Sequence, residues 1–120
     1  MSKLTLPWKP SASTSSSEGE PAPARFPGIP TATDGSGAVV HAETLASEAA
    51  GAYPITPSTQ MGEGWALAVA AGTTNAFGRR LVFFEPEGEH AAAGVTAGMS
   101  MTGLRSTNFS SGQGIAYMHE

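Results

Sequence analysis

The run Arg80-Leu-Val-Phe-Phe-Glu-Pro86 is the clearest structural signal in the chain. Four consecutive apolar residues between charged ones are typical of a short strand that is buried on both faces, as in a parallel sheet. The proline ends the run, and residues 87–102 behind it are rich in Ala, Gly and Met. Because small side chains let a helix backbone approach a sheet closely, the two segments predict a strand followed by a helix that covers it.

The same alternation continues towards the amino end. Apolar residues at three- and four-residue spacing predict an amphipathic helix over 37–50, with Gly51 as its stop. The segment 52–56 has the Tyr and Ile of a strand and is expected to form a short one. Thr56 and Pro57 then suit a helix start, with the hydroxyl as cap and the proline in the first turn.

Towards the carboxyl end, residues 105–110 are expected to form a strand and residues 112–120 another helix. Alternating helices and strands with short connections predict an α/β fold, a partial parallel sheet covered by helices. Ligands of such sheets bind beyond the carboxyl ends of the strands. Those ends fall at 55–58, 85–89 and 110–114, so a functional site is expected there.

The opening part of the chain has a different composition. Six of the nine prolines precede residue 31, and a run of Ser and Thr, broken only by Ala12, fills 11–17. Such a segment buries too little apolar surface to fold. We therefore predict a disordered, Ser/Pro-rich tail over 1–33 and a small domain over 34–120.

Charge and residue types exclude several classes of function. A net charge of -4, with only six Lys and Arg, argues against a nucleic-acid partner or an anionic membrane surface. Without cysteine the chain has no disulfide and no cysteine-ligated cluster, and the three histidines lack metal-ligand spacing, so no metal site is expected. No stretch approaches the roughly 18 apolar residues of a membrane helix. A cytoplasmic protein is expected.

The loop Tyr53-Pro-Ile-Thr-Pro-Ser-Thr59 holds one hydroxyl between two prolines. Rigidity of this kind suits a substrate clamp at Thr56, although a hydroxyl that only caps the next helix is an equally physical interpretation. The loop after the last expected strand, Ser110-Ser-Gly-Gln-Gly114, allows close backbone approach to a ligand. It lacks the third glycine of a dinucleotide fingerprint, so no phosphate site is expected there.

Glu85, Glu87 and Glu89 lie where the apolar strand turns into the next helix. At least one of these carboxylates is therefore expected over a helix amino terminus. Two interpretations stay open for it: an acid–base group, or a side chain that only complements the helix dipole.

Taken in order and spacing, three runs resemble the pyruvate:ferredoxin (2-oxoacid:acceptor) oxidoreductase family: Gly51-Ala-Tyr-Pro-Ile-Thr-Pro-Ser-Thr59, Glu89-His-Ala-Ala-Ala-Gly94 and Thr107-Asn-Phe-Ser-Ser-Gly-Gln-Gly114. The first run is highly specific, and the other two gain weight from their positions. The resemblance extends from about residue 35 to the end. It implies the thiamine-diphosphate-binding fold, specifically the part of it that holds the aminopyrimidine ring, in incomplete form.

The resemblance also implies roles for individual residues. Glu89 would be the catalytic glutamate that contacts a ring nitrogen of thiamine diphosphate, where a carboxyl group favours the tautomer that deprotonates the thiazolium ring. Pro54 and Ile55 would contact the cofactor, and Thr56 would contact the 2-oxoacid. The implied reaction is oxidative decarboxylation of a 2-oxoacid such as pyruvate to acyl-CoA, with coenzyme A as acceptor of the acyl group and ferredoxin as acceptor of the electrons.

Two departures from the family pattern leave the substrate open: His90 follows Glu89, where small residues are usual, and Gly112 replaces the usual serine. The family's G-D-G motif for pyrophosphate and magnesium is absent, and its substrate-binding arginine would fall beyond Glu120. Magnesium and iron–sulfur clusters are therefore expected from other domains or subunits of a dimeric enzyme, of which this chain would be a fragment, inactive alone. The alternative is a small non-catalytic α/β interaction domain or remnant.

Overall fold

The computed structural model describes residues 22–119. Helices and strands alternate through it: α1 (Gly35–Ala46), β1 (Ala49–Ala52), α2 (Thr59–Ala70), β2 (Val82–Phe84), α3 (Glu89–Met101), β3 (Ser106–Phe109) and α4 (Gly112–Tyr117). This order confirms the predicted alternation. Of the predicted tail, residues 1–21 lie outside the described part, and residues 22–33 contain no helix or strand. The extent of the tail stays a prediction, and residues 32–120 form a unit of their own.

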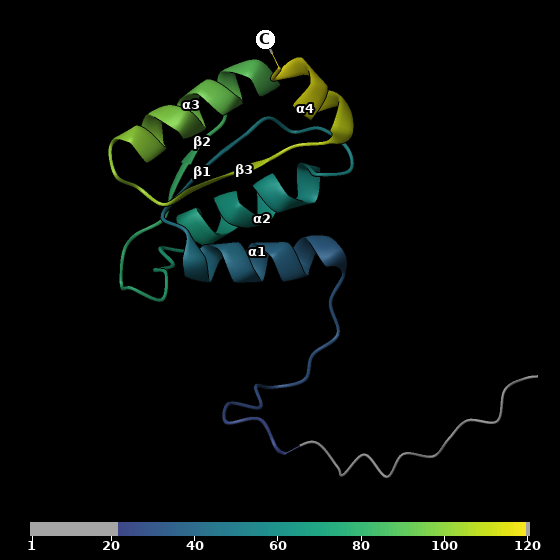
Figure 1. Cartoon of the computed structure of the whole chain (residues 1–120), viewed down its shortest axis with the longest axis vertical. Coiled ribbons are helices and arrows are strands. Elements are labelled where there is room, and N and C mark those ends of the chain that lie inside the picture. The colour runs from purple at the N-terminus through teal and green to yellow at the C-terminus, as the bar shows by residue number, and fades with distance from the viewer. Residues whose placement is uncertain (1–21, 120) are drawn as a thin grey trace, which may run out of the picture. The chain divides into compact units, whose positions relative to one another are not determined.

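The three strands form one parallel sheet in the order β2-β1-β3. Ala50 in the central strand lies opposite Phe83 on one side and Thr107 on the other. Figure 1 shows α3 over one face of the sheet and α2 over the other, with α1 packed outside α2. The predicted α/β fold with a parallel sheet covered by helices is confirmed.

The central strand differs from the prediction. It consists of Ala49–Ala52, whereas the strand was predicted over 52–56 and residues 49 and 50 were expected to end the preceding helix, which already ends at Ala46. The strand is buried throughout because it has a strand on each side and a helix on each face. A Cβ on Gly51 would overlap the Thr96 hydroxyl of α3 and lie 3.0 Å from the Ala92 carbonyl oxygen. Small residues are therefore required here, and Gly51 is a point of close packing rather than a helix stop.

The hydrophobic core lies between the sheet and α2. Trp65 is fully buried at its centre, with its ring 6.1 Å from that of Phe109. The indole nitrogen donates a hydrogen bond to the Val82 carbonyl oxygen at 3.1 Å, so α2 is tied to β2 by a directional contact as well as by burial.

The strand β2 is not buried on both faces as predicted. Leu81, just before it, is buried, but Val82 is 45% exposed and Phe84 is 51% exposed. The reason is the coverage of the sheet: α3 packs on β1 and β3, and it leaves largely uncovered the face of the edge strand β2 from which Val82 and Phe84 project. Its apolar run contributes Leu81 and Phe83 to the core and leaves alternate side chains at the surface.

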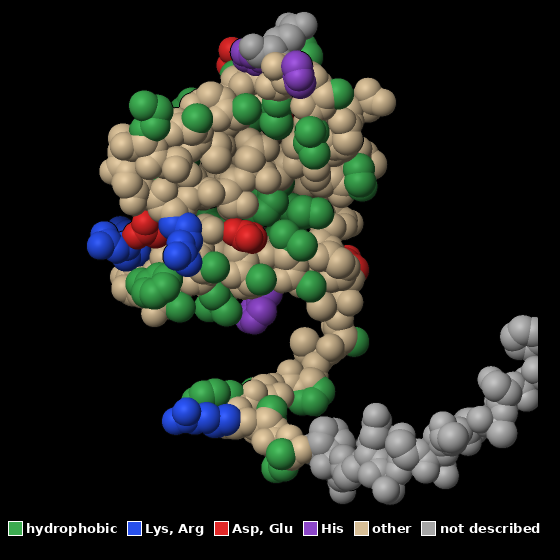
Figure 2. Space-filling view, in the orientation of Figure 1, with side chains coloured by type: hydrophobic (Ala, Val, Ile, Leu, Met, Phe, Trp, Pro, Cys, Tyr) green, Lys and Arg blue, Asp and Glu red, His purple; other side chains and the backbone are tan. Residues whose placement is uncertain are grey.

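The arginines of the folded unit gather beyond the amino ends of the strands, where Figure 2 shows blue and red side chains together. Arg79 pairs with Glu48 at 2.9 Å, and the backbone N–H of Arg105 donates to the same carboxylate. The Arg105 guanidinium lies 5.9 Å from the centre of the Phe77 ring. This end of the sheet is thus tied together by one partly buried carboxylate. Within the described residues, no helix has the length and apolar character to cross a membrane.

Candidate functional site

The topology itself points to one place on the sheet. From β1 the chain passes through α2 to β2 on one side, and then through α3 to β3 on the other side. The direction of the connections therefore reverses at the carboxyl end of β1. In parallel α/β sheets ligands bind in the crevice at such a reversal. The segments that meet there are the loop after β1, the start of α3 and the loop before α4.

Glu89 is the first residue of α3 and is half-buried. Its position in the first turn, ahead of backbone N–H groups that have no partner within the helix, favours a negative charge or an acceptor. Gly88 before it has an extended backbone and no side chain to cap those groups. The prediction that one of the three glutamates lies at a helix amino terminus is confirmed for Glu89.

The start of α4 packs directly against Glu89. Gly114 is buried, and a Cβ built on it would lie 2.9 Å from Glu89 Cγ and overlap the Ser110 hydroxyl. Glycine is therefore needed at this position because its two neighbours occupy the space of a side chain. The second and third sequence runs are thereby brought together in space, as their placement at one edge of the sheet predicted.

Ser110 is the site residue that the sequence did not single out. Its hydroxyl oxygen is buried and has no hydrogen-bond partner among the described residues. The next residue, Ser111, is the N-cap of α4, and its hydroxyl accepts from the Gly114 N–H at 3.4 Å. In the sequence the two serines are adjacent and indistinguishable, so only the packing separates them.

Thr56 does not cap α2, and that interpretation was wrong. The helix begins at Thr59 with Ser58 as the N-cap residue, while Thr56 is exposed. Ser58 closes a turn before the helix, since both its N–H and its hydroxyl donate to the Ile55 carbonyl oxygen at 2.8 Å. Because residues 55–58 form this turn, α2 begins only at Thr59, and Thr56 is too far ahead of the helix to cap it. The Thr56 hydroxyl is left free to contact another molecule.

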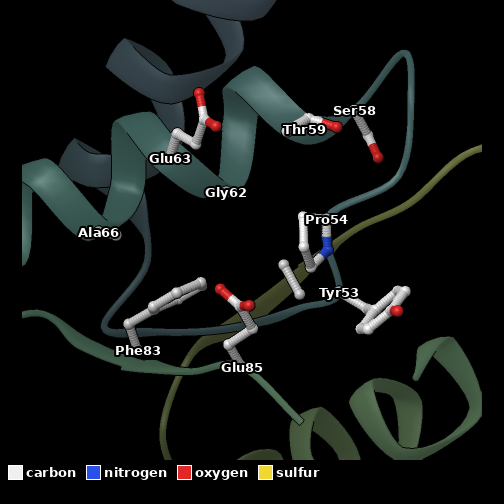
Figure 3. Close-up of a pocket in the computed structure, with 10 residues that line it drawn as sticks. Tyr53, Pro54, Ser58, Thr59, Gly62, Glu63, Ala66, Phe83 and Glu85 are labelled. Atoms are coloured by element: carbon white, nitrogen blue, oxygen red, sulfur yellow. The ribbon is translucent and has the colours of Figure 1, made fainter. Parts of the chain in front are cut away.

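A hollow of about 90 Å³ lies between α2 and the carboxyl ends of β1 and β2. Figure 3 shows the Glu85 carboxyl group pointing into it beside Phe83 and Pro54, whereas the Glu63 carboxyl group points away. Pro54 lines this hollow, but Ile55, Thr56 and Glu89 do not. The predicted site residues are therefore not all brought together: Pro54 lies beside the hollow, and Glu89 lies with the Ser110–Gly114 segment on the α3 side. Ile55 and the exposed Thr56 lie in the loop between β1 and α2, outside the hollow.

Comparison with known proteins agrees with this arrangement. Residues 41–120 match the sequence profile of a family described as pyruvate flavodoxin/ferredoxin oxidoreductase, thiamine diphosphate-binding. The chain belongs to this family. The matched residues include β1, the loop behind it, Glu89 and Gly114, which together form the site described above.

Individual members of the pyruvate flavodoxin/ferredoxin oxidoreductase family show the same relationship. The chain is 40% identical over 85 residues to the mitochondrial pyruvate dehydrogenase [NADP(+)] of Euglena gracilis, a match that covers 71% of the chain and 5% of the relative. It is 40% identical over 88 residues to pyruvate:ferredoxin oxidoreductase of Moorella thermoacetica, covering 71% and 7%. With pyruvate-flavodoxin oxidoreductase of Enterobacter agglomerans it shares 33% identity over 93 residues, covering 78% and 8%. The chain thus spans less than a tenth of these relatives.

The residues present fit the ring end of thiamine diphosphate. An aminopyrimidine is a flat heterocycle with donor and acceptor atoms at its edge. Beside the reversal point the chain offers the Glu89 carboxyl group, the unpartnered Ser110 hydroxyl and the side-chain-free Gly114. Among the described residues there is no group of three His, Asp or Glu that could hold a metal ion.

Proposed function

We propose that this chain supplies the aminopyrimidine-binding part of an enzyme that oxidatively decarboxylates a 2-oxoacid such as pyruvate, forming acyl-CoA and passing electrons to ferredoxin or flavodoxin. The observation that carries the proposal is the packing of Glu89 against Gly114 at the reversal point of the sheet, inside a thiamine-diphosphate-binding family domain. The names of the relatives, pyruvate oxidoreductases with ferredoxin or flavodoxin as partner, support the substrate and the acceptor.

In this proposal Glu89 is the catalytic residue of the chain. Its carboxyl group holds a proton at a ring nitrogen of the aminopyrimidine, and α3 fixes where that carboxyl group lies. Thiamine diphosphate, when bound, supplies the carbon nucleophile that attacks the keto group of the substrate. Pro54 and Ile55 present apolar side chains on a rigid backbone to the cofactor. The exposed Thr56 offers its hydroxyl or N–H to the substrate's carboxylate or carbonyl oxygen.

Other parts of the enzyme would complete the reaction. Magnesium, the pyrophosphate site, the iron–sulfur clusters and the coenzyme A site belong to other domains or subunits, in a dimeric assembly. Exposed apolar side chains on the helices, Leu67 at 71% and Ile115 at 64%, support contacts with such parts. The alternative, a small non-catalytic interaction domain, predicts instead that this chain alone forms a stable monomer.

The test is an assay of pyruvate-dependent reduction of ferredoxin in the complete enzyme that contains this chain. Glu89→Gln is expected to lower kcat by roughly 100- to 10,000-fold, the range of a lost acid–base group. Thr56→Val is expected to reduce kcat/KM by about tenfold, because a hydrogen bond to a charged group is lost. Glu87→Gln is the matched control, since Glu87 is an exposed carboxylate in the same loop. Glu89→Gln with kcat within twofold of the control refutes the assignment.

A further inference from the structure

The Ser110 hydroxyl group is the one buried side-chain polar atom of the described residues that has no hydrogen-bond partner. A buried hydroxyl without a partner costs free energy, because it has given up its hydrogen bonds to water. Folded proteins keep such groups where a partner is supplied by a small side-chain rotation or by a ligand. The groups around Ser110 therefore indicate which partner its hydroxyl binds.

Two neighbours of Ser110 are known from the position of Gly114. The Ser110 hydroxyl and Glu89 Cγ lie against the same point, the place where a Cβ of residue 114 would be. The Gly114 N–H is already bonded to the Ser111 hydroxyl, so it is not the partner. The carboxyl carbon of Glu89 is one bond, about 1.5 Å, beyond Cγ. An acceptor oxygen of the Glu89 carboxyl group is thus within reach of the hydroxyl through rotation about side-chain bonds.

We propose that Ser110 is a positioning residue: its hydroxyl donates a hydrogen bond to a carboxyl oxygen of Glu89 and holds that side chain in one orientation. Gly114 is the residue that makes this contact possible, because any side chain there would separate the two groups. The catalytic meaning of the contact rests on the proposed role of Glu89. The hydrogen bond itself does not, since it involves only residues of this chain.

Such a hydrogen bond affects catalysis by fixing the orientation of the Glu89 carboxyl group. A glutamate side chain has three rotatable bonds, and a carboxyl group that must meet one ring nitrogen works best when its supporting contacts limit those rotations. In the complete enzyme, Ser110→Ala is therefore expected to lower kcat by about tenfold and to change the KM for the 2-oxoacid by less than twofold. A residue that only stabilised the fold would alter the amount of active enzyme instead.

The direct experiment uses solution NMR on this 120-residue chain without cofactor. The exchange rate of the Ser110 hydroxyl proton is read from the deuterium isotope shift of its Cβ carbon. It is expected to be at least tenfold slower than that of Ser100, an exposed serine on α3. Glu89→Ala should abolish the protection. Glu89→Gln should preserve most of it, because the amide oxygen remains an acceptor.

The outcomes separate this inference from the proposed function. Equal protection in the unsubstituted chain and in Glu89→Ala, or no protection in either, overturns the Ser110–Glu89 hydrogen bond. If Glu89→Ala does not fold, Ser110→Ala takes its place, with the rotamers of the Glu89 side chain followed through its methylene couplings. Averaged couplings in that variant support the proposal, and unchanged ones refute it. Protection together with a fully active Glu89→Gln enzyme upholds the contact and refutes the catalytic role instead.

Discussion

Replacing Trp65 by alanine should remove a large share of the stability of residues 32–120. Among residues 22–119 Trp65 is the largest fully buried side chain, and truncation of a buried Trp costs about 3–5 kcal/mol in transfer and cavity terms. The change also leaves the Val82 carbonyl oxygen without its indole donor. A unit of this size has a free energy of unfolding of roughly 5–13 kcal/mol. The loss therefore amounts to a large share of the total and unfolds a chain at the lower end of that range.

Urea unfolding followed by far-ultraviolet circular dichroism measures the loss in free energy of unfolding without relying on the fluorescence of Trp65, which the substitution removes. Trp65→Phe retains a ring beside Phe109 but loses the donor, so it should cost about 1–3 kcal/mol. The matched control is Leu67→Ala, on the same helix and 71% exposed, which should stay within about 0.5 kcal/mol of the parent. A loss below about 1 kcal/mol for Trp65→Ala, with an unchanged denaturant slope, refutes the assignment of the core to the α2 face.

Two further substitutions test the packing of the sheet and its connections. Gly51→Ala should destabilise the chain by about 1–3 kcal/mol in urea unfolding, because the new methyl group overlaps the Thr96 hydroxyl. The control is Gly94→Ala, which should be neutral or stabilising because residue 94 has open space around it. Equal effects of the two substitutions would show that α3 does not pack closely on β1. Asn75→Ala should lower the free energy of unfolding by about 2–3 kcal/mol in thermal unfolding. The buried Asn75 amide donates to the Ser47 carbonyl oxygen and accepts from two backbone N–H groups of its own loop. An unaffected melting temperature would show that this loop does not unfold cooperatively with the rest of the chain.

The order of elements could be predicted from the sequence because each segment carries its own periodicity. The apolar run after Arg80 was correctly identified as a strand, but its burial was not. An apolar run shows that a strand has packing partners and does not show whether helices cover both of its faces. Val82 and Phe84 are exposed because α3 packs on β1 and β3 and leaves their face of β2 largely uncovered. The placement of a helix over a sheet is a tertiary property, so this part of the prediction failed for a physical reason.

The central strand was predicted three residues too late, over 52–56, because the residues that form it have the opposite local preference. Ala49–Ala52 contains three alanines, which favour helices, and a glycine, which disfavours strands. Its strand conformation is imposed by two flanking strands and two covering helices, between which only small side chains fit. Local propensity differs by about 1 kcal/mol per residue at most for such residues, and complete burial outweighs it.

The candidate site was predicted as a set of loops, and its internal contacts were not. The strand ends at 85–89 and 110–114 follow from a parallel sheet, and Glu89 was placed at a helix amino terminus correctly. The capping role of Thr56 was wrong because Ser58 competes for the same helix start and also bonds the Ile55 carbonyl. The contact between Glu89 and Gly114 depends on how α4 packs, which local sequence does not encode.

Close packing by small residues connects the fold to the site. Gly51 touches α3 at Ala92 and Thr96, and the same helix carries Glu89 in its first turn. A helix in a packed interior moves as a rigid element, so a methyl group at residue 51 that pushes α3 outward also shifts the Glu89 carboxyl group. Under the proposed role of Glu89, a displacement of a few tenths of an ångström suffices to weaken the contact of its carboxyl group with the cofactor ring. Gly51→Ala should therefore reduce the turnover of the complete enzyme even under conditions in which the chain is fully folded, whereas Gly94→Ala should not.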